Sequence, residues 1–326
     1  MRTTTTQPRR ITSDYGFTFL AAALLLSVLG RPLVADWLDT GAVRTWSTIF
    51  VAICVQALPF LALGVALSGI IAAVLSPTFL ARVVPKRPVL AVPFAGLAGI
   101  GLPGCECGSV PIAGRLVGSG VNPAAALTFL LAAPAVNPVV LIATAVAFPN
   151  SPMVWVARFC ASMITAVTVG WLWLAFGRTE LLDKALRNVV ADGSRWERFR
   201  AACVHDILHA GGYLVVGAAA AATLQVVVPR RVLNSIGSNA AVAILTLAIL
   251  AVLLSICSEA DAFVASGLSQ FSMTARLVFM VVGPGVDLKL LALQAGVFSR
   301  RFAVVFGTTT FVVATLTATV IGTVML

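Results

Sequence analysis

Residues 123–148 read PAAALTFLLAAPAVNPVVLIATAVAF, a run without a charged residue. A helix rises about 1.5 Å per residue, so a run of this length covers the roughly 30 Å hydrocarbon core of a bilayer. Similar apolar runs occur at 17–35, 49–75, 152–177, 209–228, 273–298 and 302–326, which makes seven predicted full crossings. We therefore predict an all-α, polytopic membrane protein, because helices satisfy their own backbone polar groups in lipid.

The composition favours the same class. Hydrophobic residues make up 60% of the 326 residues, charged residues only 10%, and the mean hydropathy is +1.02. Soluble domains carry about 25% charged residues, so this chain has too little polar surface for water. The net charge of +10 comes from Lys and Arg scattered through short loops, which argues against nucleic acid as a partner. The lipid bilayer is the predicted partner.

The basic residues predict the topology of a protein in the cell membrane. Under the positive-inside rule, the N-terminus with Arg9 and Arg10 and the charged segment 178–206 are cytoplasmic, although Arg230 and Arg231 then lie on the wrong side. The predicted division is a tail with the first transmembrane helix (1–46), a first membrane repeat (47–177), a cytoplasmic linker (178–206) and a second membrane repeat (207–326).

The interior of the chain repeats itself. Residues 107–148 align without a gap on 257–298 at a fixed offset of 150, and this register pairs Cys107 with Cys257. It also aligns a Pro-x-x-Asn motif with a Pro-x-x-Asp motif. Chance matches between frequent apolar residues would not produce this agreement. Self-similarity at a fixed offset indicates a duplicated structural unit.

Two further stretches, 89–120 and 240–271, are interrupted near the middle by a polar motif with cysteine. Their arms are too short to span a bilayer and are typical of re-entrant hairpins. Each repeat then has three crossings and one broken hairpin, and an odd number of crossings inverts the second repeat. Inverted repeats with broken helices are the usual construction of secondary transporters, with the substrate site near the breaks.

Three motifs carry a resemblance to a known family: PGCECGSVP at 103–111, FLLAAPAVNP at 129–138 and CSEADAF at 257–263. In this order they resemble the motifs of the ArsP-type predicted permeases, over residues 45–326. The resemblance implies a membrane permease. Some members of that family are similar to exporters of trivalent organoarsenicals.

The cysteines predict a site for a soft solute. Cys105 and Cys107 precede a short helix, and a helix N-terminus favours thiolate over thiol. Thiolates bind thiophilic metals and trivalent metalloids, whereas hard cations prefer oxygen. Cys257 holds the equivalent place in the second repeat, so three thiols could surround one soft centre. The alternative is that these cysteines are small hydrophobic residues of the core.

Three carboxylates, Glu106, Glu259 and Asp261, lie in otherwise apolar sequence. Carboxylates inside a membrane are costly and normally face a cavity, a partner or an ion. We predict that they couple transport to an ion, with the proton as the candidate. The alternative for Glu259 and Asp261 is a structural pair with Arg276 or Lys289.

Asn137 and Asp287 follow Pro134 and Pro284, and a proline frees backbone groups and breaks a helix. We predict that Asn137 and Asp287 line the substrate cavity. The alternative is that each caps a helix.

The predicted function is a secondary-type permease for the efflux of a small thiophilic solute, such as a trivalent (organo)arsenical or related metalloid. No phosphate-binding Gly-Lys-Ser or Gly-Lys-Thr loop occurs, and no cofactor, resident metal or catalytic residue is predicted. One alternative is a membrane thiol/disulfide oxidoreductase, which thiol-exchange turnover would reveal. The other is a non-transporting membrane scaffold, which a substrate flux in proteoliposomes would exclude.

Overall fold

A computed structural model describes residues 41–74, 85, 87–101, 106–182, 194–227 and 240–326, and the regular structure of these residues is entirely helical. Six apolar helices or helix pairs are long enough to cross a membrane, and they correspond to six of the seven predicted crossings. The remaining predicted crossing, 17–35, lies outside the described residues. The chain is an all-α polytopic membrane protein, in which Ile49–Leu326 form one compact unit.

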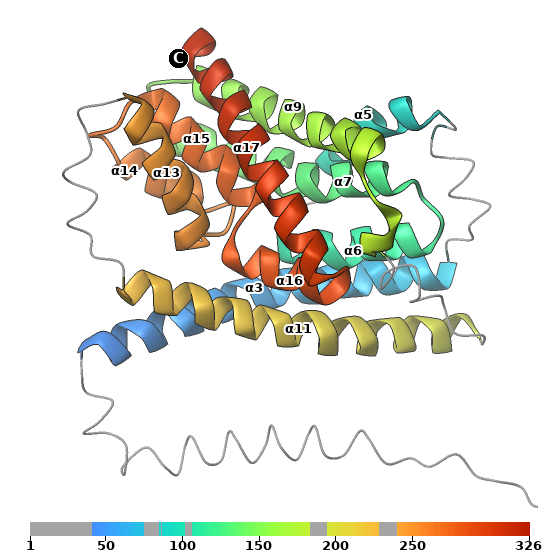
Figure 1. The fold of residues 1–326 in the computed structure, drawn as a ribbon. Coiled ribbons are helices and arrows are strands. Elements are labelled where there is room, and N and C mark those ends of the chain that lie inside the picture. Colours follow the sequence, from blue (N-terminus) through green and yellow to red (C-terminus); the bar gives the residue numbers. More distant parts are fainter. Residues whose placement is uncertain (1–40, 75–84, 86, 102–105, 183–193, 228–239) are drawn as a thin grey trace, which may run out of the picture. The chain divides into compact units, whose positions relative to one another are not determined.

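The order of the helices is duplicated (Figure 1). The first series is α3 (Gly41–Val74), α5 (Pro88–Ala98) with the 3-10 turn η1 (Gly99–Gly101), α6 (Glu106–Gly118), α7 (Pro123–Val136), α8 (Pro138–Ala147) and α9 (Met153–Phe176). After the 3-10 turn η2 (Thr179–Leu182), the second series is α11 (Arg195–Val227), α13 (Ala240–Leu254), α14 (Asp261–Gly267), α15 (Met273–Gly285), α16 (Leu288–Val297) and α17 (Arg300–Met325). Each helix of the first series therefore has a counterpart in the second.

The predicted domain boundaries at 46/47 and 206/207 fall inside helices α3 and α11, so neither boundary coincides with a break in secondary structure. The two broken stretches are present as α5 and α6 in the first half and as α13 and α14 in the second. Whether they are re-entrant, and whether the second half is inverted, stay predictions.

Asn137 divides the crossing at 123–148 into α7 and α8. Its side-chain amide donates to the Ala133 carbonyl at 3.1 Å, and its side-chain oxygen accepts from the Val140 N–H at 2.9 Å. Pro138 lacks the N–H that would continue α7. Pro134, which was expected to break the helix, lies inside α7. The break follows three residues later, because the Asn137 side chain hydrogen-bonds a backbone carbonyl of α7 and a backbone N–H of α8 there.

The second half has the same device at the same offset. Asp287 accepts from the Leu290 N–H at 2.6 Å and caps α16, as Asn137 caps α8. Likewise, Asn122 caps α7 and Ser272 caps α15. These matched caps support the duplication, because apolar sequence alone would not place helix starts in the same register.

Helices α7 and α15 are the buried centre of the unit and pack against each other. α5, α6 and α9 pack on α7, whereas α13, α14 and α17 pack on α15. The equivalent helices α9 and α17 also pack together, and Ser68 of α3 donates to Asp206 of α11 at 2.6 Å. Contacts between equivalent elements are expected when two related halves meet about a twofold axis.

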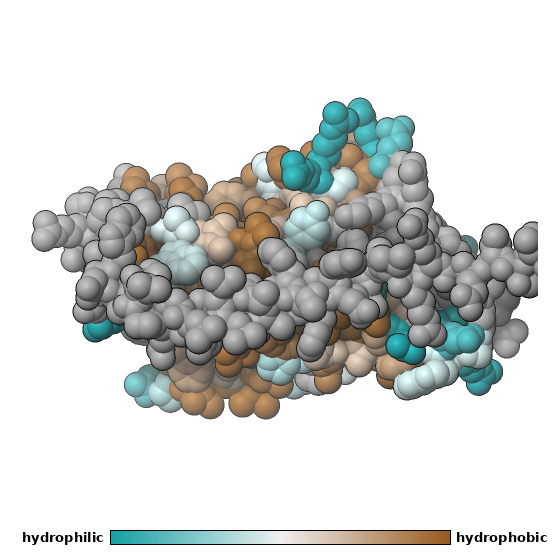
Figure 2. Space-filling view, turned by 90° about the horizontal axis from the view of Figure 1, so that it is seen from below, coloured by the Kyte–Doolittle hydropathy of each residue, from teal (hydrophilic) through white to brown (hydrophobic). Residues whose placement is uncertain are grey.

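The outer faces of the long helices are apolar. Exposed large side chains include Val51, Val55, Leu58 and Leu63 on α3 and Val304, Val312, Leu316 and Val320 on α17. In Figure 2, hydrophobic residues dominate the visible described surface, and hydrophilic residues gather in clusters at its margins. Apolar faces of this extent on a polytopic protein are the surfaces that contact lipid.

Candidate functional site

A buried lysine of the second half pairs with a carboxylate of the first half. Lys289, near the start of α16, is 3% exposed and places Nζ 2.6 Å from Glu106 Oε1 and 3.4 Å from Asp287 Oδ2. The same ammonium donates to the Ser255 carbonyl oxygen at 3.1 Å. Glu106 is 1% exposed, so neither charge has access to bulk water. A buried charge of this kind is tolerated only when its partners are in place.

The backbone conformation of Ser255 places its carbonyl oxygen at the Lys289 ammonium. Ser255 follows the end of α13 and has a φ of 47°, a left-handed conformation that is uncommon outside glycine. This turn breaks the helix, presents the Ser255 carbonyl to Lys289, and lets the Ser255 hydroxyl accept from the Leu288 N–H at 3.1 Å. Backbone strain of this kind is concentrated at functional sites.

Two of the predicted substrate thiols lie beside this ion pair. Cys107 is 0% exposed and Cys257 is 4% exposed, and both belong to one buried cluster although they come from different halves. Cys107 is in the first turn of α6, and the Cys257 carbonyl accepts the backbone N–H of Asp261 that begins α14. Cys107 follows Glu106, the partner of Lys289, and Cys257 comes two residues after Ser255, whose carbonyl oxygen binds the same ammonium.

Glu259 is the acceptor for one of these thiols. The Cys257 thiol donates its hydrogen to Glu259 Oε2. Glu259 is partly exposed, whereas Cys257 is buried. The carboxylate therefore links the buried thiol to a more accessible position.

A second buried ion pair also joins the halves, with the cation in the first half and the carboxylate in the second. Arg158 of α9 is fully buried and places its Nη2 2.7 Å from Asp261 Oδ2 on α14. The guanidinium also donates to the Ser258 carbonyl at 3.2 Å and to the Thr144 hydroxyl at 2.8 Å. In each pair, the carboxylate lies at the broken stretch of one half and the cation comes from the other half.

Arg158 is the residue of this candidate site that the sequence did not lead us to predict. If Glu259 and Asp261 were structural, the sequence predicted Arg276 or Lys289 as their partner. In the structure Asp261 pairs with Arg158 instead. Lys289 pairs with Glu106 instead, and Arg276 Nε donates to a backbone carbonyl. The signal was present, because Arg158 is a single charge inside the apolar run 152–177.

Several buried polar atoms near these pairs have no hydrogen-bond partner among the described residues. They include Glu106 Oε2, the Ser258 hydroxyl and Asp261 Oδ1. Buried polar atoms are nearly always hydrogen-bonded, so these carboxylate and hydroxyl oxygens are unusual positions in the core.

The structure buries four of the predicted residues in this region, Glu106, Cys107, Cys257 and Asp287, and the partly exposed Glu259 contacts Cys257. Asp261 lies on Arg158, and Asn137 serves as the α7–α8 cap described above. Cys105 lies outside the described residues. Within the part of the chain that the structure describes, no group of three or more His, Cys, Asp or Glu side chains is arranged to hold a metal ion.

Comparison with known proteins agrees with the fold. Residues 43–323 match the model of a family, ArsP_1, described as "Predicted permease". A protein of Streptococcus mutans named "Putative two-component membrane permease complex subunit" is 36% identical over 275 residues, which cover 81% of this chain and 91% of that protein. UPF0718 protein YcgR of Bacillus subtilis is 38% identical over 263 residues, 78% of this chain and 90% of that protein. No solved structure matches the chain.

Proposed function

Because this chain belongs to the ArsP family of predicted permeases, we propose that it is a secondary-type permease that exports a small thiophilic solute. A trivalent organoarsenical or a related metalloid has the required chemistry. The observation that carries the proposal is that Cys107 and Cys257, one from each half, are both buried in one core cluster and adjoin in sequence two groups that bind Lys289, Glu106 and Ser255. A solute held by both thiols would bridge the halves, at the place where a transporter with broken helices binds its substrate.

The thiols would bind a trivalent arsenical by exchange. As each sulfur bonds to arsenic, one arsenic–oxygen bond breaks, and the thiol proton leaves with the hydroxyl group as water. Glu259 accepts hydrogen from Cys257, so it is placed to carry this proton to the leaving hydroxyl. Release of the solute reverses these steps.

Ion coupling is assigned to the carboxylates, with the proton as the ion. Glu106 holds Lys289 beside the thiols, so its protonation would remove the charge that binds the ammonium. Asp261 would act in the same way on Arg158. Because both ion pairs join the two halves, a change in either would alter how the halves are held together, which alternating access requires.

The proposed location is the cell membrane, with the N-terminus and the 178–206 linker in the cytoplasm and the C-terminus outside. Reporter fusions after residue 46, within the linker and after Leu326 test this topology. An external linker would give each repeat an even number of crossings and would remove the argument for inversion.

Transport should be measured in proteoliposomes loaded with a trivalent methylarsenical, with arsenite and antimonite in parallel. We expect flux from the wild-type protein and a loss of flux in Cys107→Ser and Cys257→Ser. Cys54→Ser and Cys160→Ser are matched controls, because these partly exposed cysteines lie outside the cluster. If the serine variants of the cluster transport normally, the thiol site is wrong. If the wild type moves none of these solutes, the substrate class is wrong.

The oxidoreductase alternative is less well supported by the geometry. Disulfide exchange needs a thiol that a second protein or small disulfide can reach. That alternative uses Cys105 and Cys107, of which Cys105 lies outside the described residues and Cys107 is 0% exposed. Burial of Cys107 fits enclosure of a small solute better than exchange with a partner.

A further inference from the structure

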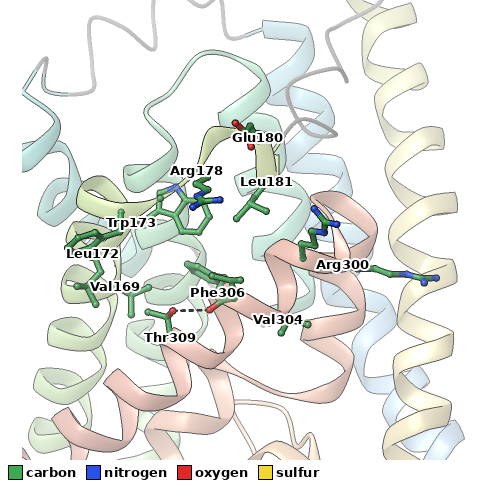
Figure 3. A pocket seen from close by; sticks show the side chains of 14 residues that line it. Val169, Leu172, Trp173, Arg178, Glu180, Leu181, Arg300, Val304, Phe306 and Thr309 are labelled. Carbon is green, nitrogen blue, oxygen red and sulfur yellow. Dashed lines mark hydrogen bonds between the residues drawn. The ribbon is translucent and has the colours of Figure 1, made fainter.

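A cavity of about 810 Å³ lies where α9 ends, η2 turns and α17 begins (Figure 3). Its inner wall is aromatic, because the Trp173 indole packs edge-on against Phe306 with ring centroids 5.9 Å apart. The exposed apolar side chains of Phe176, Val304 and Val305 continue this wall to the outer face of the helices. None of the residues of the buried ion pairs lines this cavity.

The walls of the cavity are fixed by hydrogen bonds. The Ser299 hydroxyl donates to the Leu181 carbonyl at 2.9 Å and also caps α17, so it fastens η2 to the start of that helix. The Gly177 N–H donates to the Trp173 carbonyl at 2.7 Å. An added Cβ at Gly177 would lie 2.7 Å from the indole Nε1, so only glycine lets the chain turn this closely over the ring. The cavity is thus a built feature of the fold.

The polar part of the cavity is cationic. Arg178, Arg300 and Arg301 line it together with a single acid, Glu180. The structure records no ion pair or hydrogen bond between the three guanidinium groups and the described residues. The Trp173 indole N–H likewise has no acceptor among them. The start of α17 adds the positive end of a helix dipole.

The position is that of a membrane boundary. α9 and α17 are both candidate spans, and the arginines stand where the first ends and the second begins. Basic pockets between transmembrane helices on the cytoplasmic side are suited to anionic lipid head groups. A planar guanidinium binds two phosphate oxygens at once. The aromatic and aliphatic wall can pack against an acyl chain.

We infer that this cavity binds an anionic glycerophospholipid, with the phosphate at the arginines and one acyl chain along Trp173 and Phe306. The inference does not depend on the transported solute, because neither Cys107 nor Cys257 nor any residue of the buried ion pairs lines the cavity. Free phosphate shares the head-group chemistry but would leave the apolar wall uncovered.

The test uses the purified full-length protein in a neutral detergent. Binding of phosphatidylglycerol, phosphatidylcholine and inorganic phosphate is measured by native mass spectrometry and by thermal unfolding. We expect phosphatidylglycerol alone to bind and to raise the unfolding temperature. In the double variant Arg178→Gln/Arg300→Gln its affinity should fall about 25-fold, since each arginine contributes about fivefold. The control Arg195→Gln/Arg200→Gln removes the same charge from exposed positions of α11 and should bind as the wild type does.

Three results would overturn the inference. Equal binding of phosphatidylcholine would show that charge does not select the lipid. An equal loss in both double variants would show a diffuse surface effect. Displacement of phosphatidylglycerol by inorganic phosphate would identify a simple anion site. The arginines are exposed, so the variants should keep their lipid-free unfolding temperature, which verifies that they fold.

Discussion

Replacement of Lys289 by methionine should destabilise the protein more than replacement of Glu106 by glutamine. The Lys289 ammonium lies 2.6 Å from Glu106, 3.4 Å from Asp287 and 3.1 Å from the Ser255 carbonyl oxygen. Methionine keeps the length of the side chain but removes the charge, so two buried carboxylates remain without a cation. Glu106→Gln is milder, because the lysine keeps Asp287 and the carbonyl.

The expected magnitudes follow from these contacts. Removal of one partner from a buried ion pair costs about 3–5 kcal/mol, and Lys289→Met should lie at the upper end because two carboxylates lose their partner. Glu106→Gln should cost about 1.5–3 kcal/mol, the range for a hydrogen bond to a charged group. In the double variant Lys289→Met/Glu106→Gln only Asp287 stays unpaired. The double variant should therefore lose less unfolding free energy than the two single variants lose together, by about 0.5–3 kcal/mol.

Unfolding by sodium dodecyl sulfate in mixed micelles, followed by circular dichroism, measures these free energies. Arg195→Met is the control, since it removes an exposed cation from α11 and should change stability little. The reasoning fails if Lys289→Met unfolds at the same detergent fraction as the wild type. It also fails if Glu106→Gln is the more damaging change.

Three other predictions concern packing, coupling and the second ion pair. Gly217→Ala should cost about 1–3 kcal/mol because its Cβ would lie 2.6 Å from the Lys289 Cα, whereas Gly212→Ala meets nothing within 4 Å and should be neutral or stabilising in the same titration. Glu259→Gln should slow arsenical flux and flatten its dependence on pH; an unaltered profile in proteoliposomes would exclude the carboxylate from coupling. Arg158→Met should cost about 3–5 kcal/mol, and a wild-type unfolding curve would show that its partner is not charged.

Sequence patterns predicted the helical membrane fold because apolar length is a local property. Six crossings and both broken stretches follow from runs of residues that a reader can measure along the chain. The offset of 150 predicted the pairing of helices, and the caps at Asn137 and Asp287 lie in that register. The position of the break relative to Pro134 was not predictable, since it depends on which side chain hydrogen-bonds the unpaired backbone groups at the helix ends.

The candidate site was predictable only in part. Glu106, Cys107 and Cys257 stand out as reactive groups in apolar sequence, and the structure buries all three, with both cysteines in the same core cluster. Their cations come from distant helices, so Arg158 and the role of Lys289 required the tertiary contacts. Pairing across halves has no local signature in one sequence.

The central claim is that one soft centre is bound by thiols from both halves. It is tested most directly by intact-mass measurement of a variant in which only Cys107 and Cys257 remain, after treatment with a monosubstituted trivalent arsenical. The account predicts one arsenical per chain, with loss of two waters, and no stable adduct once either remaining cysteine is replaced by serine. A stable adduct on either single-cysteine protein, or none on the two-cysteine protein, would contradict it.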